Sequence, residues 1–317
     1  MSLVKLFCKK ILAKLGYCIL KNTEQPRVDQ GNSFPENLCC KYRDLAFVPF
    51  GAGYSNARWL FTNNTLDNPD IMKLFSHIEK LPHGFGIGMD ERSVEIPYVF
   101  SRLGSEKARL LDAGSSLNHR PLLSRLIKNN KQIVSYTLAP ERQNSYDLGI
   151  SYIFGDLREN AFQSNYFDET VSMSVLEHVG CDNKYFTGSN SDKTNNKNML
   201  EAVKEIRRVT KGGGNVLITV PYGIKMDLGF QMQFDEKLLS KIIETLVPFD
   251  RVETVFYRYT SSGWVLATQK ECAQCQYVTW FADWMNTQIK PEPTPIEPDF
   301  ACCARAVACV FIKGLSK

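Results

Sequence analysis

Short apolar runs alternate regularly with helical segments from residue 108 onward, and this alternation constrains the fold more than any other feature of the chain. A parallel sheet requires such an order, because each strand needs a crossover segment before the next strand can run in the same direction. The predicted strands are 108–113, 131–137, 150–154, 168–174 and 214–220. The predicted helices are 118–129, 158–163 and 196–210. The sequence therefore predicts an α/β fold with a doubly wound, mostly parallel sheet.

The C-terminal part of the chain is expected to close this sheet. A helix at 235–247 and a strand at 250–258 precede an insertion near 260–300, and a last, antiparallel strand is predicted at 305–313. A second insertion is predicted near 181–198, where a run rich in Asn, Ser, Asp and Lys cannot bury itself and favours a mobile loop.

The first 22 residues predict an amphipathic, basic helix. They hold five lysines and no acidic residue, and the lysines interrupt every apolar run well before the ~20 residues of a membrane span. One interpretation is a helix that lies in the headgroup plane of an anionic membrane, on its inner face. The other is a terminal helix that packs on the body of the protein and keeps its lysines in solvent. Residues 23–104 are interpreted as an N-terminal extension or cap.

The charge balance argues against nucleic acid as a partner. The formal net charge is +4 and residues 1–22 carry +5, so the remainder sums to −1. A nearly neutral body lacks the clustered Lys and Arg that neutralise phosphate backbones. Nucleic acid is therefore not an expected partner, and the sequence does not predict the oligomeric state.

Ten cysteines are spread through the 317 residues and follow no secretory signal pattern. We interpret them as reduced thiols and expect the protein in the cytoplasm. Cys272 and Cys275 with Cys302 and Cys303 offer four sulfur ligands, but the second pair is adjacent and lacks the spacing that lets both thiolates converge on zinc. No metal site is predicted.

The end of the first predicted strand is the first candidate for a binding site. In an open α/β sheet the ligand sits beyond the carboxyl ends of the strands. There the sequence reads Asp112-Ala113-Gly114-Ser115, in which Gly114 permits close backbone approach. The following helix N-terminus offers unpaired N–H groups to a carboxylate, so this turn suits an amino-acid moiety.

Two later strand ends add to this pattern. Asp156 follows the third strand and offers an acceptor to an adenine amino group, and Glu177-His178 follows the fourth strand. In order and spacing, these segments and residues 205–221 resemble the successive motifs of class I S-adenosylmethionine-dependent methyltransferases, particularly the type 11 group. The resemblance covers roughly residues 90–222. It implies a Rossmann-like fold, with residues 105–317 as the methyltransferase domain.

The same resemblance implies S-adenosyl-L-methionine as the cofactor. The residues that it assigns to the cofactor are Asp112, Ala113, Gly114 and Ser115 at the methionine end, Asp156 and Leu157 at the adenine, and Ser172 and Met173 below it. One departure concerns the second strand, 133–137, which lacks the acidic residue that usually binds the ribose hydroxyls. Glu141, a little further on, is the expected substitute.

A narrower resemblance concerns the acceptor. Residues 112–119, 155–158 and 176–183 are similar to bacterial methyltransferases associated with surface-polysaccharide synthesis. The function implied is O-methylation of a sugar hydroxyl in cell-surface glycan biosynthesis. Two alternatives stay open: another small-molecule, lipid or quinone-type acceptor, and a non-catalytic cofactor-binding protein. A nucleobase acceptor is disfavoured, because Ser-Val-Leu-Glu stands where such enzymes carry Asn/Asp-Pro-Pro-Tyr.

Transfer to a hydroxyl requires a base, and His178 is the first candidate because an unperturbed imidazole pKa near 6.5 suits that role. The alternative is a structural role, in which the histidine only orients its loop. Glu177 is the second predicted catalytic residue, and His119 is expected to contact the cofactor. Glu177-His178 is similar to a metal-binding variant in quinone-type methyltransferases, but Ser174 occupies the place of their additional Glu. Metal therefore remains unassigned.

Overall fold

The computed structural model describes residues 42, 50, 53–141, 143–183, 187, 196–278 and 297–316. The predicted helix at 1–22, most of the predicted loop at 181–198 and residues 279–296 of the predicted insertion lie outside the described residues.

The described residues form one sheet of eight strands in the order β3-β2-β1-β4-β5-β10-β8-β9. The strands are β1 (Ala108–Ala113), β2 (Lys131–Thr137), β3 (Ser151–Phe154), β4 (Phe167–Met173), β5 (Thr210–Pro221), β8 (Phe249–Thr260), β9 (Gly263–Ala267) and β10 (Ala306–Leu315). Strands β1 to β5 are parallel, whereas β10 runs antiparallel to both β5 and β8. The predicted mostly parallel sheet with an antiparallel closing strand is confirmed.

The strand order reverses between β1 and β4. From β1 the chain adds β2 and β3 on one side and then β4 and β5 on the other. Such a reversal leaves a crevice beyond the carboxyl ends of the two central strands, where ligands bind in this architecture. The ends of β1 and β4 are therefore the place to search for a site.

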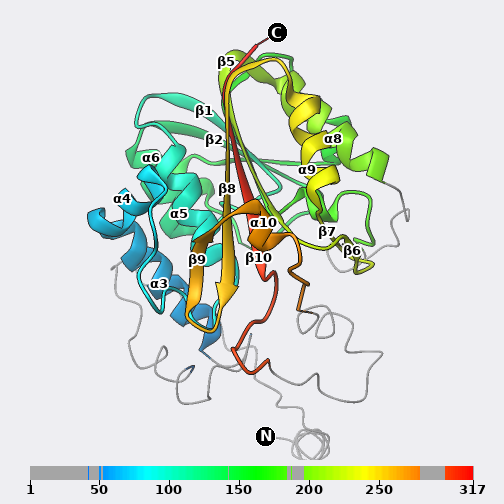
Figure 1. Ribbon diagram of the computed structural model, residues 1–317. Helices are drawn as coiled ribbons and strands as arrows, with labels where there is room; N and C mark the ends of the chain where they lie inside the picture. Colours follow the sequence, from blue (N-terminus) through cyan, green and yellow to red (C-terminus); the bar gives the residue numbers. More distant parts are fainter. Residues whose placement is uncertain are drawn as a thin grey trace, which may run out of the picture.

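Helices cover both faces of the sheet (Figure 1). One face carries α3 (Tyr54–Asp67), α4 (Pro69–His77), α5 (Arg92–Arg102) and α6 (Arg120–Lys128), and the other carries α8 (Asn196–Val209) and α9 (Glu236–Leu246). Local chemistry fixes their starts. Asn68 caps α4 by accepting from the amides of Asp70 and Ile71, with Pro69 at the first helical position, and Asp235 caps α9.

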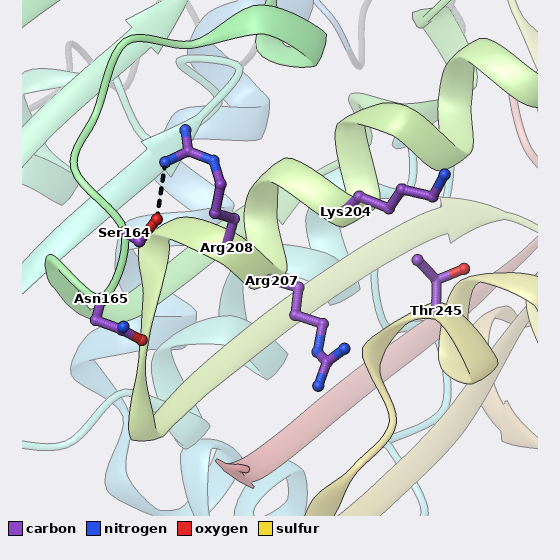
Figure 2. Close-up of a pocket in the computed structure, with 6 residues that line it drawn as sticks. All are labelled: Ser164, Asn165, Lys204, Arg207, Arg208 and Thr245. Atoms are coloured by element: carbon purple, nitrogen blue, oxygen red, sulfur yellow. Dashed lines mark hydrogen bonds between the residues drawn. The ribbon is translucent and has the colours of Figure 1, made fainter. Parts of the chain in front are cut away.

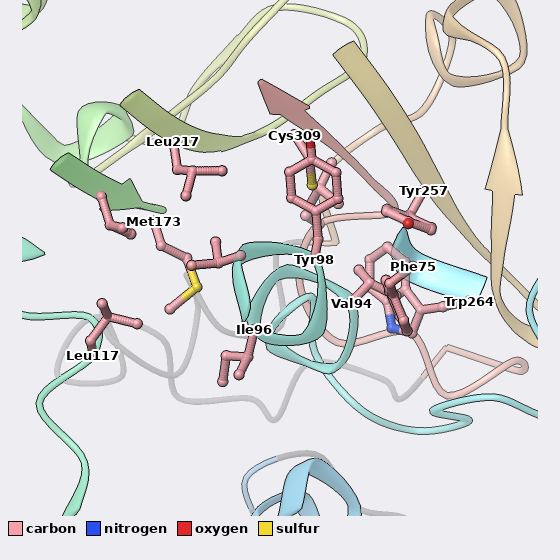
Figure 3. Packing of buried hydrophobic residues seen from close by; sticks show 14 of the residues in the cluster. Phe75, Val94, Ile96, Tyr98, Leu117, Met173, Leu217, Tyr257, Trp264 and Cys309 are labelled. Carbon is pink, nitrogen blue, oxygen red and sulfur yellow. The ribbon is translucent and has the colours of Figure 1, made fainter. Parts of the chain in front are cut away.

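Strand side chains alternate between two hydrophobic clusters. Leu110 joins the cluster under α5 and α6, and its neighbour Leu111 joins the cluster under α8 and α9. Figure 3 shows α5 inside the first cluster, with Val94, Ile96 and Tyr98 beside residues of the sheet. The last helix of the predicted N-terminal extension is thus packed on the sheet itself.

Several local predictions differ from the structure. The predicted helix at 158–163 is wrong: a 3-10 turn, η2 (Leu157–Glu159), ends there because the Asn160 side chain accepts from the amide of Phe162 and competes with helix formation. The predicted insertion near 260–300 contains a strand, β9, and a short helix, α10 (Gln269–Cys272). Shorter elements are η1 (Tyr146–Leu148), η3 (Leu176–His178), β6 (Met226–Asp227) and β7 (Met232–Gln233). Among the described residues, every helix is too short or too polar to span a membrane.

Candidate active site

Asp112, at the end of β1, is completely buried and only partly satisfied. Its Oδ2 accepts from the amide of Leu117 at 3.1 Å and from the Ser135 hydroxyl at 3.3 Å. Its Oδ1 has no hydrogen-bond partner among the described residues. Burial raises the pKa of Asp112 to about 7. A buried carboxyl with one unpaired oxygen is expected where a bound ligand supplies the missing hydrogen-bond donor.

The turn after Asp112 depends on the glycine for packing as well as for access. Gly114 has a φ of 116°, and a Cβ added there would lie 2.2 Å from a methyl group of Val175. Ser115 follows with a φ of 66°, and its buried Oγ has no partner in the part of the chain described. Ala113 is fully buried. A side chain at position 114 would therefore collide with Val175. Packing within the protein itself requires glycine here.

Glu141 lies just beyond the end of β2 and is held there from two sides. The Asn118 amide donates to its Oε2 at 2.8 Å, and the Thr137 hydroxyl lies 3.4 Å from its Oε1. Tyr152, on β3, donates to the Asn118 side-chain oxygen at 2.7 Å. The structure thus places the predicted substitute acid beside the turn after β1, still exposed to solvent.

Asp156, after β3, differs from Asp112 because both of its oxygens are already paired. Arg158 binds them through Nε at 2.9 and 3.0 Å and through Nη2 at 2.6 Å, and this hydrogen bonding holds the pKa of Asp156 below its usual value. The neighbouring Leu157 is buried. An adenine amino group would have to share this carboxylate with Arg158.

The end of β4 is tied to both neighbouring segments. The Met173 carbonyl accepts from the Ser116 hydroxyl at 2.6 Å and from Arg92 at 3.3 Å. Ser172 and Met173 are fully buried, and the Ser172 Oγ has no partner among the residues described. The end of β4 therefore joins the turn after β1 to the start of α5.

The two predicted catalytic residues follow in η3. Glu177 is 3% exposed, and its Oε2 lacks a hydrogen-bond partner within the described part of the chain. Burial raises its pKa well above the usual value, and Glu95 adds to the effect. His178 Nδ1 lies 2.9 Å from the Phe230 carbonyl oxygen, which can only accept, so Nδ1 carries the proton. Burial lowers the pKa of His178 to about 4, well below the 6.5 expected from the sequence.

Sequence reasoning missed the charged residues at the start of α5. Glu95 accepts from the Ser174 hydroxyl at 2.6 Å and from the Thr219 hydroxyl at 2.7 Å, and it pairs with Arg92 at 2.6 Å. These contacts fasten α5 over the ends of β4 and β5. Charged residues in an otherwise apolar helix were the available signal. Nothing local indicated which strands they contact.

His119 and the cysteines are placed as follows. The His119 ring packs on Trp59 at a centroid distance of 4.2 Å, and burial lowers its pKa to about 3. Cys272 and Cys275 belong to the cluster under α8 and α9, whereas Cys302 and Cys303 belong to the other cluster. The four sulfurs therefore do not converge, and the described residues contain no group of three or more ligands that could hold a metal.

Two hollows on the described surface lie away from these strand ends. One, of about 410 Å³, is lined by Ser164, Asn165, Lys204, Arg207, Arg208 and Thr245 (Figure 2). The other, of about 510 Å³, lies at the amino edge of the sheet, around Lys131, Asp168 and Lys211. Neither contains a predicted site residue. The candidate site is defined by the buried polar groups at the carboxyl edge.

Comparisons with solved structures find remote likenesses. A putative methyltransferase from Bacillus halodurans has a TM-score of 0.42 and 13% identity, over 70% of this chain and 99% of that one. A putative sarcosine dimethylglycine methyltransferase from Galdieria sulphuraria gives 0.40 and 18%, over 67% and 80%. The [4+2]-cyclase SpnF gives 0.40 and 17%, over 67% and 77%. At these values none of them supports a functional argument.

The comparison with protein families is more specific. No curated protein matches the chain. Residues 113–218, which run from the last residue of β1 to within β5, match the family model of a methyltransferase domain, the type 11 group. The match begins one residue after Asp112 and covers the ends of β2, β3 and β4. The matched segment, residues 113–218, is that of an S-adenosylmethionine-dependent methyltransferase, with S-adenosylmethionine as the methyl donor.

Proposed function

We propose that this methyltransferase modifies a sugar hydroxyl in cell-surface glycan biosynthesis, with the donor bound across the ends of β1, β2, β3 and β4. The observation that carries the proposed site is Asp112, fully buried at the strand-order reversal with one oxygen unpaired. A buried acceptor of this kind suits the ammonium group of an amino-acid moiety. The donor, when bound, supplies an activated methyl group.

The remaining cofactor contacts follow from position. Ala113, Gly114 and Ser115 form the turn beside Asp112, where amides and the Ser115 hydroxyl can face the methionine end. Glu141, fixed by Asn118, is the proposed acceptor for the ribose hydroxyls. The proposed adenine residues are Asp156 and Leu157, and the residues proposed to lie below the donor are Ser172 and Met173.

His178 is the proposed base. Its low pKa keeps the imidazole neutral at pH 7, and the hydrogen bond from Nδ1 to Phe230 fixes the tautomer in which Nε2 carries the lone pair. A neutral imidazole can take the proton from a hydroxyl as the new bond forms. Glu177, next to it, is proposed to contact the acceptor.

The acceptor class rests on two supports. The segments around β1, β3 and β4 resemble enzymes of surface-polysaccharide synthesis, and buried carboxyl groups at the end of β4 can accept hydrogen bonds from hydroxyls. A lipid or quinone-type acceptor is the alternative. An acceptor that is part of a lipid-linked intermediate would also give the basic segment 1–22 a membrane to bind.

Two measurements test the proposal. Isothermal titration with S-adenosylmethionine should show one site in the wild-type protein and much weaker binding in Asp112→Asn. Mass spectrometry of glycans and lipids from cells with and without the gene should show a mass difference of one methyl group in a glycan. A methyl group missing from a quinone or a lipid instead would reject the sugar acceptor while leaving the enzyme class intact.

A further inference from the structure

Three carboxyl groups gather at the end of β4. Glu91 directly precedes α5, Glu95 lies in its first turn, and Glu177 lies in η3. Glu95 accepts from the hydroxyl of Ser174, which directly follows β4, and Arg92, the neighbour of Glu91, donates to the Met173 carbonyl. The start of α5 and η3 therefore meet at the end of β4. Arg92 pairs with Glu95, which leaves the group with more acidic than basic side chains.

The three groups are not equally satisfied. Glu95 has Arg92, Ser174 and Thr219 as partners. Glu91 Oε2 and Glu177 Oε2 are buried without a hydrogen-bond partner among the described residues, and Glu177 is 3% exposed. Burying such groups is costly unless something satisfies them. The two unpaired oxygens therefore point to a ligand that supplies a hydrogen-bond donor or a positive charge.

We propose that Glu91 and Glu177, beside the Arg92–Glu95 pair, form a counter-charge for the sulfonium of the methyl donor, so that the donor binds more tightly than its demethylated product. This inference rests on the proposed site at the strand ends. In S-adenosylmethionine the sulfur is a positively charged sulfonium. In S-adenosylhomocysteine, the product, the same sulfur is a neutral thioether. Selection of the charged form would limit inhibition by the product.

A change in protonation should accompany binding. Burial and neighbouring acids raise the pKa of Glu91 to about 8 and raise that of Glu177, so both carboxyls hold protons at pH 7 in the empty protein. A cation stabilises the carboxylate form and releases a proton to the buffer. The titratable and charged groups that face this pair are Asp90, Arg92, Glu95, Cys181, Tyr277 and Cys303.

Proton release by Asp112 does not affect the difference between S-adenosylmethionine and S-adenosylhomocysteine. Its pKa of about 7 means that it also releases a proton when an ammonium group binds. Both molecules carry the same ammonium group and the same adenosine. The contribution of Asp112 therefore cancels, and the difference between the two ligands reports on the charge at sulfur.

The first experiment uses the wild-type protein. Isothermal titration of S-adenosylmethionine and S-adenosylhomocysteine at pH 7, in phosphate and in Tris, gives the number of protons released by each ligand. The donor should release more protons than the product, and its affinity advantage should grow as the pH rises from 6 to 8. Equal proton release by both ligands overturns the proposal. Absence of binding by either ligand rejects the proposed site instead.

The second experiment removes one charge. Glu177→Gln keeps the shape of the side chain and should reduce the ratio of donor to product affinity by about tenfold, since an opposite charge at close range is worth one pKa unit or more. Glu201→Gln, on the exposed surface of α8, changes the net charge equally and should leave the ratio unchanged. An unchanged ratio in Glu177→Gln contradicts the proposal, and the proton-release measurement decides the question if that variant does not fold.

Discussion

Buried charged groups are fully paired at the amino edge of the sheet and only partly paired at the carboxyl edge. At the amino edge Lys131 pairs with Glu169 at 2.6 Å and donates to the Glu106 carbonyl at 3.1 Å, with its side chain 1% exposed. At the carboxyl edge Asp112 and Glu177 are equally buried and each keeps an unpaired oxygen. We propose that the difference separates groups that stabilise the fold from groups that bind a ligand. Substitutions at the two edges should therefore fail in different ways.

The largest effect is expected for His178 at the carboxyl edge. His178→Ala should slow turnover on the order of 10²–10⁴-fold, the usual contribution of a positioned base, and should keep the affinity for S-adenosylmethionine. Single-turnover rates and calorimetry separate the two quantities.

The pH profile provides the check on this role. The imidazole accepts a proton only while it is neutral, and its pKa is lowered to about 4. The His178-dependent part of the wild-type rate should therefore persist down to about pH 4, not fall near 6.5. Near-normal turnover in His178→Ala would move the base role to Glu177 or another group.

The next effect concerns the amino edge. Lys131→Met leaves Glu169 buried without its ion pair and should lower the free energy of unfolding by about 3–5 kcal/mol. Lys211→Met is the matched control. Its pair with Asp168 is 36% exposed on both sides, so the change should be about 0–1 kcal/mol. Urea unfolding measures both, and an equal loss in the two variants would contradict the distinction between buried and exposed pairs.

The sequence predicts the sheet well where local patterns suffice. The bounds of β1 and β2 follow directly from apolar runs that end at polar turns. The pattern fails at 158–163, where the Asn160 side chain competes for a backbone amide, and at β9, where the Gly263 turn with a φ of 83° forms a hairpin inside a predicted insertion.

The residues of the proposed site also differ in whether the sequence alone could indicate them. Of the proposed site residues, Asp112 lies at the end of a predicted strand, and Glu141 and Glu177 lie a few residues beyond one, so the sequence could indicate all three. The contribution of α5 could not be found in this way, because Glu95 reaches Ser174 across 79 residues and Thr219 across 124. Such contacts depend on tertiary packing, and no local spacing encodes them. The low pKa of His178 has the same origin, since burial is its main cause.

A smaller effect is expected at Asp112. Asp112→Asn should weaken binding of S-adenosylmethionine by roughly ten- to a hundredfold, as loss of a charged hydrogen bond does. It should not lower the stability of the empty protein at pH 8. The folded-state pKa of Asp112 is raised to about 7, so its contribution to stability exists at low pH and is lost as the pH rises through 7. Thermal unfolding at pH 8 with calorimetry tests both statements, and a large loss of stability there would place Asp112 with the structural charges of the amino edge.

The smallest effect is expected at Asp156, which resembles the amino edge because Arg158 already pairs with it. Asp156→Asn keeps an acceptor for an adenine amino group, so the affinity for S-adenosylmethionine should fall only about threefold, within the range of a neutral hydrogen bond. Adenosine separates the two ends of the proposed site, because it lacks the amino-acid moiety. Its binding should weaken in Asp156→Asn and remain unchanged in Asp112→Asn. If adenosine binding responds to Asp112 and not to Asp156, the proposed orientation of the donor along the strand ends is reversed, and the methionine end would then lie toward β3.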